Sequence, residues 1–123
     1  MGVKRFLHVK LDVADIDRSV AFYCDLLGFE QVVRYDRNDG VTIVQVAAAG
    51  SPVGIELWRE GDHVGLANDR LHVALEATDL VATVEQLRVT GVTIEREVFW
   101  IGHEQIAFIR DPDGYLIELN EIV

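Results

Sequence analysis

The sequence predicts an α+β fold in which a β-α-β-β-β module occurs twice in tandem, over about residues 4–60 and 70–122. Three observations predict it: a segment that recurs at a constant offset, a helical pattern after each copy, and three strand-like stretches after each helical pattern. We expect the modules to form a cupped, mostly antiparallel eight-stranded sheet with the helices on its outside, in a single domain spanning residues 1–123.

The repeat is visible at both ends of the module. Residues 7–16, LHVKLDVADI, correspond to residues 71–80, LHVALEATDL, and every position is identical or similar except Lys10 and Ala74. The match returns later, where GIEL at 54–57 aligns with LIEL at 116–119. Self-similarity at a nearly fixed spacing indicates two copies of one structural unit.

A helical pattern follows each copy of the repeated segment. Apolar residues recur at helical spacing and stop at Gly28 in the first half and at Gly91 in the second. Asp15 and Asp79 are placed to cap the two helix starts. The apolar positions are Ile16, Val20, Tyr23 and Leu27, then Leu80, Val84 and Leu87.

Three strand-like stretches follow each helix, separated by residues that favour turns. The expected strands are Phe29–Arg37, Gly40–Ala48 and Val53–Glu60 in the first half, and Val92–Phe99, Glu104–Arg110 and Tyr115–Ile122 in the second. The expected turns are Asn38–Gly40, Gly50–Pro52 and Asp111–Gly114. Polar residues 61–70 form the hinge between the halves.

Four residues that can bind a metal occupy repeated positions. His8 and His72 stand in the first strand of each half, Glu56 and Glu118 in the last, and each lies between apolar neighbours. Because side chains alternate across a strand, all four point away from the helix-covered core. Taken singly, each is explained as a residue on the solvated face of a sheet. The symmetry instead predicts a His–Glu pair from each half, converging on one metal ion.

The ligand types restrict the metal and the composition restricts the partners. Imidazole and carboxylate without thiolate suit nickel, cobalt, zinc, manganese or ferrous iron. The 11 basic and 21 acidic residues give a formal net charge of -10, which disfavours nucleic acid and anionic membranes as partners. With no membrane-spanning apolar run, no signal-like start and a single cysteine, Cys24, we expect a cytoplasmic protein. Cys24 is interpreted as a packed helix residue rather than a nucleophile.

These residues resemble the vicinal-oxygen-chelate superfamily, and within it the glyoxalase I family, over essentially the whole chain. The resemblance rests on the two His strands, the run Ser19–Phe29, the segment Ile55–Leu57, and Asp111–Tyr115 leading to Ile117–Leu119. It implies a metal held by His8, Glu56, His72 and Glu118, with nickel or cobalt preferred over zinc or iron because the chain has no long insertion. It also implies a homodimer.

The activity implied by the resemblance is that of a metal-dependent lyase or isomerase. Its substrate would be a hemithioacetal or similar α-hydroxycarbonyl compound, which reacts through a metal-stabilised enediolate. Glu118, or Glu56 for the opposite stereochemistry, would take the carbon-bound proton and return it to the neighbouring carbon.

Several residues around the expected metal depart from the glyoxalase pattern or extend it. Asp12 stands where that family usually carries an arginine for a glutathione carboxylate, and Arg59 is a candidate substitute. Trp58 shares the alternation of Glu56 and should line the cup. Phe99, Trp100 and His103, from an excursion between strands, are further candidate substrate contacts. His103 and His63 are interpreted as loop residues rather than metal ligands.

The resemblance leaves other functions open. A bleomycin-resistance-type protein would sequester a cationic small molecule in the same cleft, which the acidic composition fits. A ring-cleaving dioxygenase would use His8, His72 and Glu118 as a facial triad on ferrous iron, with Glu56 in a position that this chemistry needs open. Epimerases acting on CoA thioesters are a third alternative, although they commonly carry glutamine where Glu56 stands.

Overall fold

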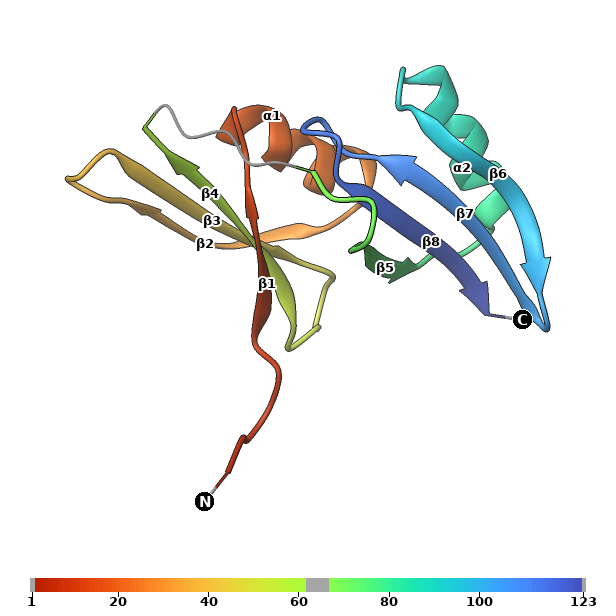
Figure 1. Ribbon diagram of the computed structural model, residues 1–123, viewed down its shortest axis with the longest axis horizontal. Helices are drawn as coiled ribbons and strands as arrows, with labels where there is room; N and C mark the ends of the chain where they lie inside the picture. Colours follow the sequence, from red (N-terminus) through yellow and green to blue (C-terminus); the bar gives the residue numbers. More distant parts are fainter. Residues whose placement is uncertain (1, 62–66, 123) are drawn as a thin grey trace. The chain divides into compact units, whose positions relative to one another are not determined.

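The protein folds into two compact units, Met1–Leu66 and Ala67–Val123, in the computed structural model (Figure 1). The structure describes residues 2–61 and 67–122. The boundary between the units lies within the polar segment that the sequence predicts as a hinge. Neither helix in these residues is long and apolar enough to cross a membrane.

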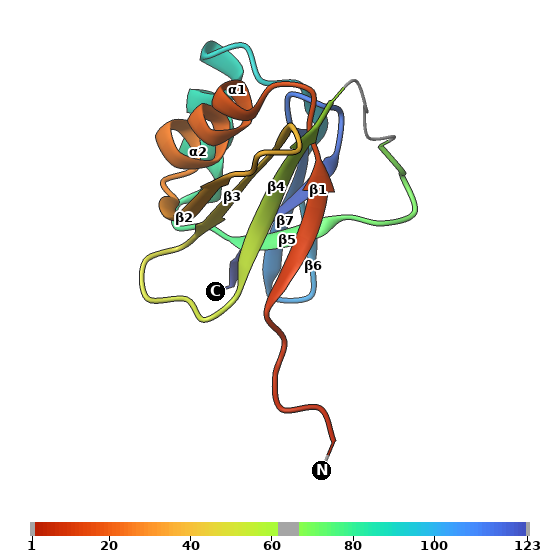
Figure 2. The ribbon, with the colours of Figure 1, turned by 90° about the vertical axis from the view of Figure 1, so that its left-hand side faces the viewer.

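The first unit is one βαβββ module. Strand β1 pairs in parallel with β4, which pairs antiparallel with β3, and β3 pairs antiparallel with β2. The helix contacts β3 and β4 and so covers one face of this sheet (Figure 2). The elements are β1 His8–Asp12, α1 Ile16–Ala21 with a continuing π-helical turn Phe22–Leu26, β2 Glu30–Asp36, β3 Val41–Ala47 and β4 Gly54–Glu60.

The second unit repeats the same topology. Its sheet has the order β5-β8-β7-β6, with β5 parallel to β8 and the other pairs antiparallel, and α2 contacts β6, β7 and β8. The elements are β5 Val73–Glu76, α2 Leu80–Val89, β6 Ile94–Ile101, β7 Glu104–Arg110 and β8 Leu116–Ile122. The predicted α+β fold of two βαβββ modules is confirmed, as two four-stranded mixed sheets that are open rather than closed into barrels.

Both helices begin and end where the sequence predicts. The Asp15 carboxylate accepts a hydrogen bond from the backbone N–H of Arg18 at 3.0 Å, and Asp79 accepts one from Ala82 at 3.3 Å. After each helix the chain turns through a glycine with positive φ, at Gly28 and Gly91, because a left-handed residue there costs little without a side chain.

The core of each unit lies between its helix and its sheet. In the second unit, Leu80, Val84 and Leu87 are all buried, as the helical spacing predicts. In the first, the most buried helix positions are Phe22, Tyr23 and Ser19. Hydrophobic periodicity does not identify Ser19 because its side chain is polar.

Cys24 lies in the π-helical turn and is half-buried. Partial burial raises the pKa of the Cys24 thiol above its ordinary value, and the neighbouring Asp25 carboxylate adds to the effect. Both causes disfavour the thiolate, which is the nucleophilic form. The interpretation of Cys24 as a packing residue is consistent with this environment.

A carboxylate organises the turn that leads into β8. Asp111 is 5% exposed, and its Oδ1 accepts backbone N–H bonds from Asp113 and Tyr115, both at 2.9 Å. The backbone N–H of Gly114 donates to the Asp111 carbonyl at 3.0 Å, which closes the turn. This turn sets where β8, the strand that carries Glu118, begins.

Replacing Asp111 tests this turn. We expect Asp111→Ala to lower the free energy of unfolding by about 1–3 kcal/mol, because two backbone donors lose their buried acceptor. Asp111→Asn keeps an oxygen acceptor in place and is the matched control, expected to lose less. Urea denaturation of the three proteins makes the comparison, and equal stability of the wild type and Asp111→Ala would contradict this role.

Candidate metal centre

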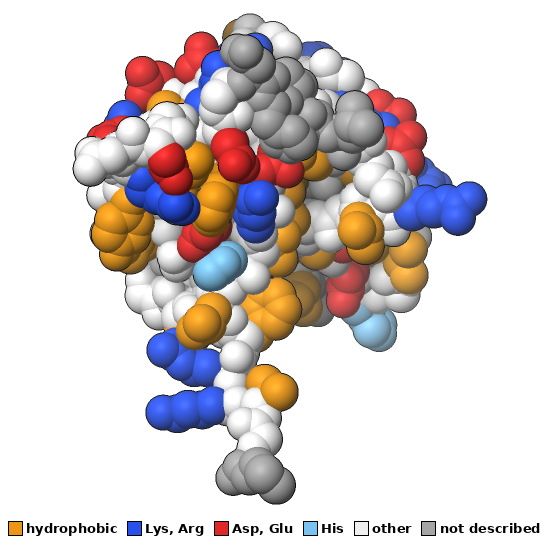
Figure 3. All heavy atoms as spheres, turned by 60° about the vertical axis from the view of Figure 1, so that its left-hand side comes forward, with side chains coloured by type: hydrophobic (Ala, Val, Ile, Leu, Met, Phe, Trp, Pro, Cys, Tyr) orange, Lys and Arg blue, Asp and Glu red, His pale blue; other side chains and the backbone are white. Residues whose placement is uncertain are grey.

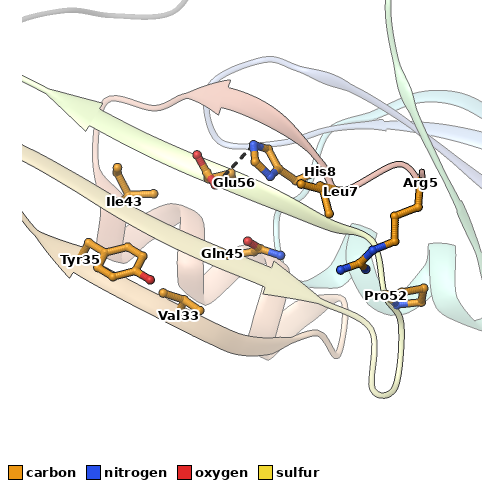
Figure 4. A pocket seen from close by; sticks show the side chains of 9 residues that line it. All are labelled: Arg5, Leu7, His8, Val33, Tyr35, Ile43, Gln45, Pro52 and Glu56. Carbon is orange, nitrogen blue, oxygen red and sulfur yellow. Dashed lines mark ion pairs between the residues drawn. The ribbon is translucent and has the colours of Figure 1, made fainter. Parts of the chain in front are cut away.

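The first unit brings His8 and Glu56 together. Strands β1 and β4 pair in parallel with Lys10 opposite Glu56, so the side chain of His8 falls diagonally beside Glu56 on the same face. His8 Nε2 lies 3.4 Å from Glu56 Oε2 (Figure 4), and the two side chains are 35% and 17% exposed.

The second unit repeats this arrangement with His72 and Glu118. Ala74 pairs with Glu118 in the parallel β5–β8 ladder, and His72 Nε2 lies 3.6 Å from Glu118 Oε1. The His72 ring also packs edge-on against Phe108, with 5.5 Å between ring centroids. Residues on either side of Glu118, Ile117 and Leu119, are buried, so the pair lies on the sheet face that points away from the core.

The donor atoms of each pair are spaced as ligands of one ion can be. Two donors at about 2.1 Å from an ion lie at most roughly 4.2 Å apart, and the observed separations of 3.4 Å and 3.6 Å fall within that limit. Among residues 2–61 and 67–122, no three His, Cys, Asp or Glu side chains are grouped so that they could hold a metal ion. Each unit holds two of the four residues predicted as metal donors.

A hollow in the first unit adjoins its His–Glu pair. Its volume is about 330 Å³, and it opens across β2, β3 and β4 (Figure 4). It is lined by Arg5, Leu7, His8, Val33, Tyr35, Ile43, Gln45, Pro52 and Glu56. Its mixed polar and apolar wall suits a small organic molecule with a few hydrogen-bonding groups.

Gly54 gives this wall its close packing. A Cβ atom at Gly54 would lie 2.7 Å from the Val46 carbonyl oxygen and 3.0 Å from Gln45 Nε2. Glycine is therefore what allows the Gln45 side chain to lie over β4 beside the position paired with His8. The sequence analysis did not single out Gln45 and Tyr35. Gln45 pairs with Glu56, and Tyr35 pairs with Ile43, two residues before Gln45, so both lie on the face of Glu56.

A second set of contacts surrounds Glu56. The indole Nε1–H of Trp58 donates to Glu56 Oε1 at 2.5 Å, and the Lys10 ammonium lies 4.5 Å from the Trp58 ring centroid. Lys10 Nζ is also 3.1 Å from Asp12 Oδ1. The predicted placement of Trp58 and Asp12 on the face of His8 and Glu56 agrees with these contacts. Lys10 offsets the negative charge that Asp12 brings to this face.

In the second unit, aromatic rings accompany the His–Glu pair. Phe99 stacks on Phe108 with 6.3 Å between centroids, and the Arg96 guanidinium lies 3.6 Å from the centre of the Phe99 ring.

Arg110 is held by carboxylates of the same unit, with contacts of 2.7 Å to Asp69 and 3.2 Å to Glu95. Hydrogen bonds to these two carboxylates raise the pKa of the Arg110 guanidinium.

The remaining predicted contacts are placed differently. Phe99 and Trp100 belong to strand β6, and His103 stands in the short turn before β7, so the expected excursion between strands is a hairpin. Trp100 alternates with Phe99 and is 57% exposed. Arg59 alternates with Trp58 on β4 and so shares the face of the buried Leu57, opposite to Glu56. We leave Arg59, Trp100 and His103 out of the proposed site; His63 lies outside the described residues.

Charges of both signs are interspersed on the surface of the protein. Figure 3 shows acidic and basic side chains next to one another on one face, despite the net charge of -10. The first unit includes several such pairs, among them Arg34 with Asp36 at 3.0 Å and Arg37 with Asp39 at 2.6 Å. At these positions the paired arginines partly offset the net negative charge.

Comparison with known proteins places this chain in a family. Residues 5–119 match the family described as Glyoxalase/Bleomycin resistance protein/Dioxygenase superfamily, and the chain belongs to it.

The similar proteins include lactoylglutathione lyases and a glyoxalase I. The chain is 35% identical over 120 residues to a protein of Synechocystis named "Probable lactoylglutathione lyase", covering 92% of each. It is 32% identical to the lactoylglutathione lyase of Haemophilus influenzae, covering 95% of this chain and 92% of that protein. Among solved structures, the trypanothione-dependent glyoxalase I of Leishmania major is 31% identical, with a TM-score of 0.83, over 97% of this chain and 87% of that one.

Proposed function

We propose that this protein is a metal-dependent lyase of the glyoxalase I type. The observation that carries the proposal is the pair of equivalent His–Glu contacts, one in each unit, at the same positions of the βαβββ module. A protein that only sequesters a small molecule has no need of two such pairs. The relatives named lactoylglutathione lyase support the same activity.

The four proposed ligands are His8, Glu56, His72 and Glu118, acting together on one divalent ion. Two imidazoles and two carboxylates suit nickel or cobalt, with zinc or iron as alternatives. When bound, such an ion acts as a Lewis acid toward the oxygens of a hemithioacetal or a similar α-hydroxycarbonyl substrate.

Proton transfer is assigned to a carboxylate beside the substrate. Glu118 would take the carbon-bound proton at one carboxylate oxygen and return it to the neighbouring carbon, with Glu56 in that role for the opposite stereochemistry. Within the described residues, the only polar side-chain partner of Glu118 is His72, whereas Glu56 also accepts the Trp58 hydrogen bond. Glu118 is therefore the less restrained of the two carboxylates.

The first unit carries the residues that bear on which thiol the substrate contains. Asp12 stands where the glyoxalase I pattern has an arginine, and it pairs with Lys10 on the site face. A solved relative from Leishmania major is trypanothione-dependent, so the thiol varies among proteins similar to this one. The hollow beside His8 offers Arg5, Tyr35 and Gln45 as polar contacts for it.

Metal content tests the centre directly. We expect nickel-reconstituted protein to hold about one divalent ion per chain, and His72→Ala to abolish this binding because one ligand of each set is lost. Elemental analysis measures it, with His103→Ala, a turn residue, as the control. Metal absent from both the purified and the reconstituted protein would overturn the enzyme proposal and favour a small-molecule binding protein.

Turnover tests the reaction. We expect isomerisation of a methylglyoxal hemithioacetal, assayed with glutathione and with trypanothione as the thiol. Glu118→Gln should lower kcat by about 10²–10⁴-fold, because the general base is lost, and Glu30→Gln on exposed β2 is the matched control. Wild-type activity in Glu118→Gln at full metal content would contradict the assignment of the base.

We also propose a homodimer in which the modules of the single domain close a cup, within one chain or across two. Light scattering should then report twice the mass of one chain. Mixed and refolded His8→Ala and His72→Ala variants distinguish the two modes. Closure across chains restores about a quarter of the metal content, because half of the dimers are mixed and one of their two sites is intact. Closure within a chain restores none.

A further inference from the structure

The two His–Glu pairs differ in what surrounds their carboxylates. Glu56 accepts a hydrogen bond from Trp58, two residues further along β4. The repeat places Asn120 at the position of Trp58 in the second unit, and the Asn120 amide donates to Glu104 at 3.0 Å rather than to Glu118. The environment of the two carboxylates is thus asymmetric although their histidine contacts are alike.

The two oxygens of Glu56 have different partners, because Trp58 donates to only one of them. Oε1 accepts the indole N–H at 2.5 Å, while Oε2 lies 3.4 Å from His8 Nε2. A carboxylate with one oxygen occupied by a strong donor is restrained about its terminal torsion and offers the other oxygen to a neighbour. Trp58 is partly buried on β4, which limits the movement of the ring.

Lys10 reinforces this contact. Its ammonium lies 4.5 Å from the centre of the Trp58 ring, in the geometry of a cation–π interaction. A cation over the ring draws electron density from the indole and makes its N–H a better donor. Asp12, 3.1 Å from Lys10 Nζ, holds the ammonium in place.

The same residues account for a departure from the repeat. Lys10 against Ala74 is the one dissimilar position in the ten-residue repeated segment, and Trp58 against Asn120 is a second departure on the partner strand. Lys10 and Trp58 touch each other, so the two departures form one feature of the first unit. The second unit has the same strand order with Ala74 and Asn120 at these positions.

We infer that Trp58, with Lys10 stacked on it, is a positioning residue that holds Glu56 with Oε2 alone presented beside His8. This inference rests on the proposed metal centre, in which the pair of the first unit is then the fixed half. Trp58 acts through Glu56 and donates no ligand of its own. Among the described residues, the second unit has no indole donor equivalent to Trp58, so neither oxygen of Glu118 accepts such a hydrogen bond.

The indole resonances test the contact without a metal. The chain has two tryptophans, Trp58 and the exposed Trp100, so a ¹⁵N spectrum should show two indole N–H signals. We expect one to be shifted downfield and slow to exchange with solvent, to move toward the other in Glu56→Gln, and to stay in place in Glu118→Gln. Two similar signals that ignore Glu56→Gln would overturn the inference.

Metal affinity tests the consequence. Trp58→Phe keeps an aromatic ring beneath Lys10 but removes the donor, and we expect it to weaken nickel binding by about 10–100-fold, the effect of losing an outer partner of a ligand. Trp100→Phe makes the same chemical change elsewhere and should leave the affinity unchanged. Competition with a chelating dye measures both, and equal affinity of Trp58→Phe and wild type would overturn the inference.

The two tests separate this inference from the proposed function. If wild-type protein binds no nickel, the metal centre fails, and the positioning role fails with it whatever the indole signals show. If wild-type protein binds nickel and Trp58→Phe binds it equally well, only the positioning role fails. Should Trp58→Phe not fold, the indole signals of the wild type and of Glu56→Gln still decide, since neither alters residue 58.

Discussion

The parallel pairing of the first and last strands of each module is the constraint on which the candidate site depends. In both units the residue opposite the glutamate is the one two positions after the histidine: Lys10 faces Glu56, and Ala74 faces Glu118. The histidine therefore reaches the glutamate diagonally on the same face. Parallel neighbours need a long crossover, and the helix with its following strands supplies it in each module.

This constraint explains why the site face is polar while the fold stays stable. Glu56 and Glu118 alternate with residues of the core, such as Leu57 and Leu119, so the strands that anchor each sheet also carry these two proposed ligands. A slip of one residue in the β1–β4 register would turn the buried Leu11 to the opposite face and move His8 off the face of Glu56. Core packing thus protects the register that keeps each histidine and glutamate 3.4–3.6 Å apart.

The two halves repeat one module but differ in the residues around their His–Glu pairs. In the first unit Trp58 donates to Glu56 and Lys10 lies over the Trp58 ring, whereas in the second Phe108 packs against His72 and Phe99 stacks on Phe108. A firmly held carboxylate and a freer one suit a centre in which one group stays a ligand while another exchanges a proton. The residues that differ between the halves, such as Lys10 and Trp58, therefore distinguish the proposed roles of Glu56 and Glu118.

The sequence by itself determined the module, the strand order along the chain, the helix caps and the equivalent places of His8 and His72 and of Glu56 and Glu118 in the two modules, because these follow from local periodicity and from the repeat. The sequence did not predict the places of Gln45, Tyr35 and Phe108. Their positions near the His–Glu pairs depend on which strands pair. Tertiary structure also decided that Trp100 lies in a strand and that Lys10 offsets Asp12. Above all, it brought the Trp58 indole onto one oxygen of Glu56, a contact that depends on side-chain rotamers and that sequence spacing cannot specify.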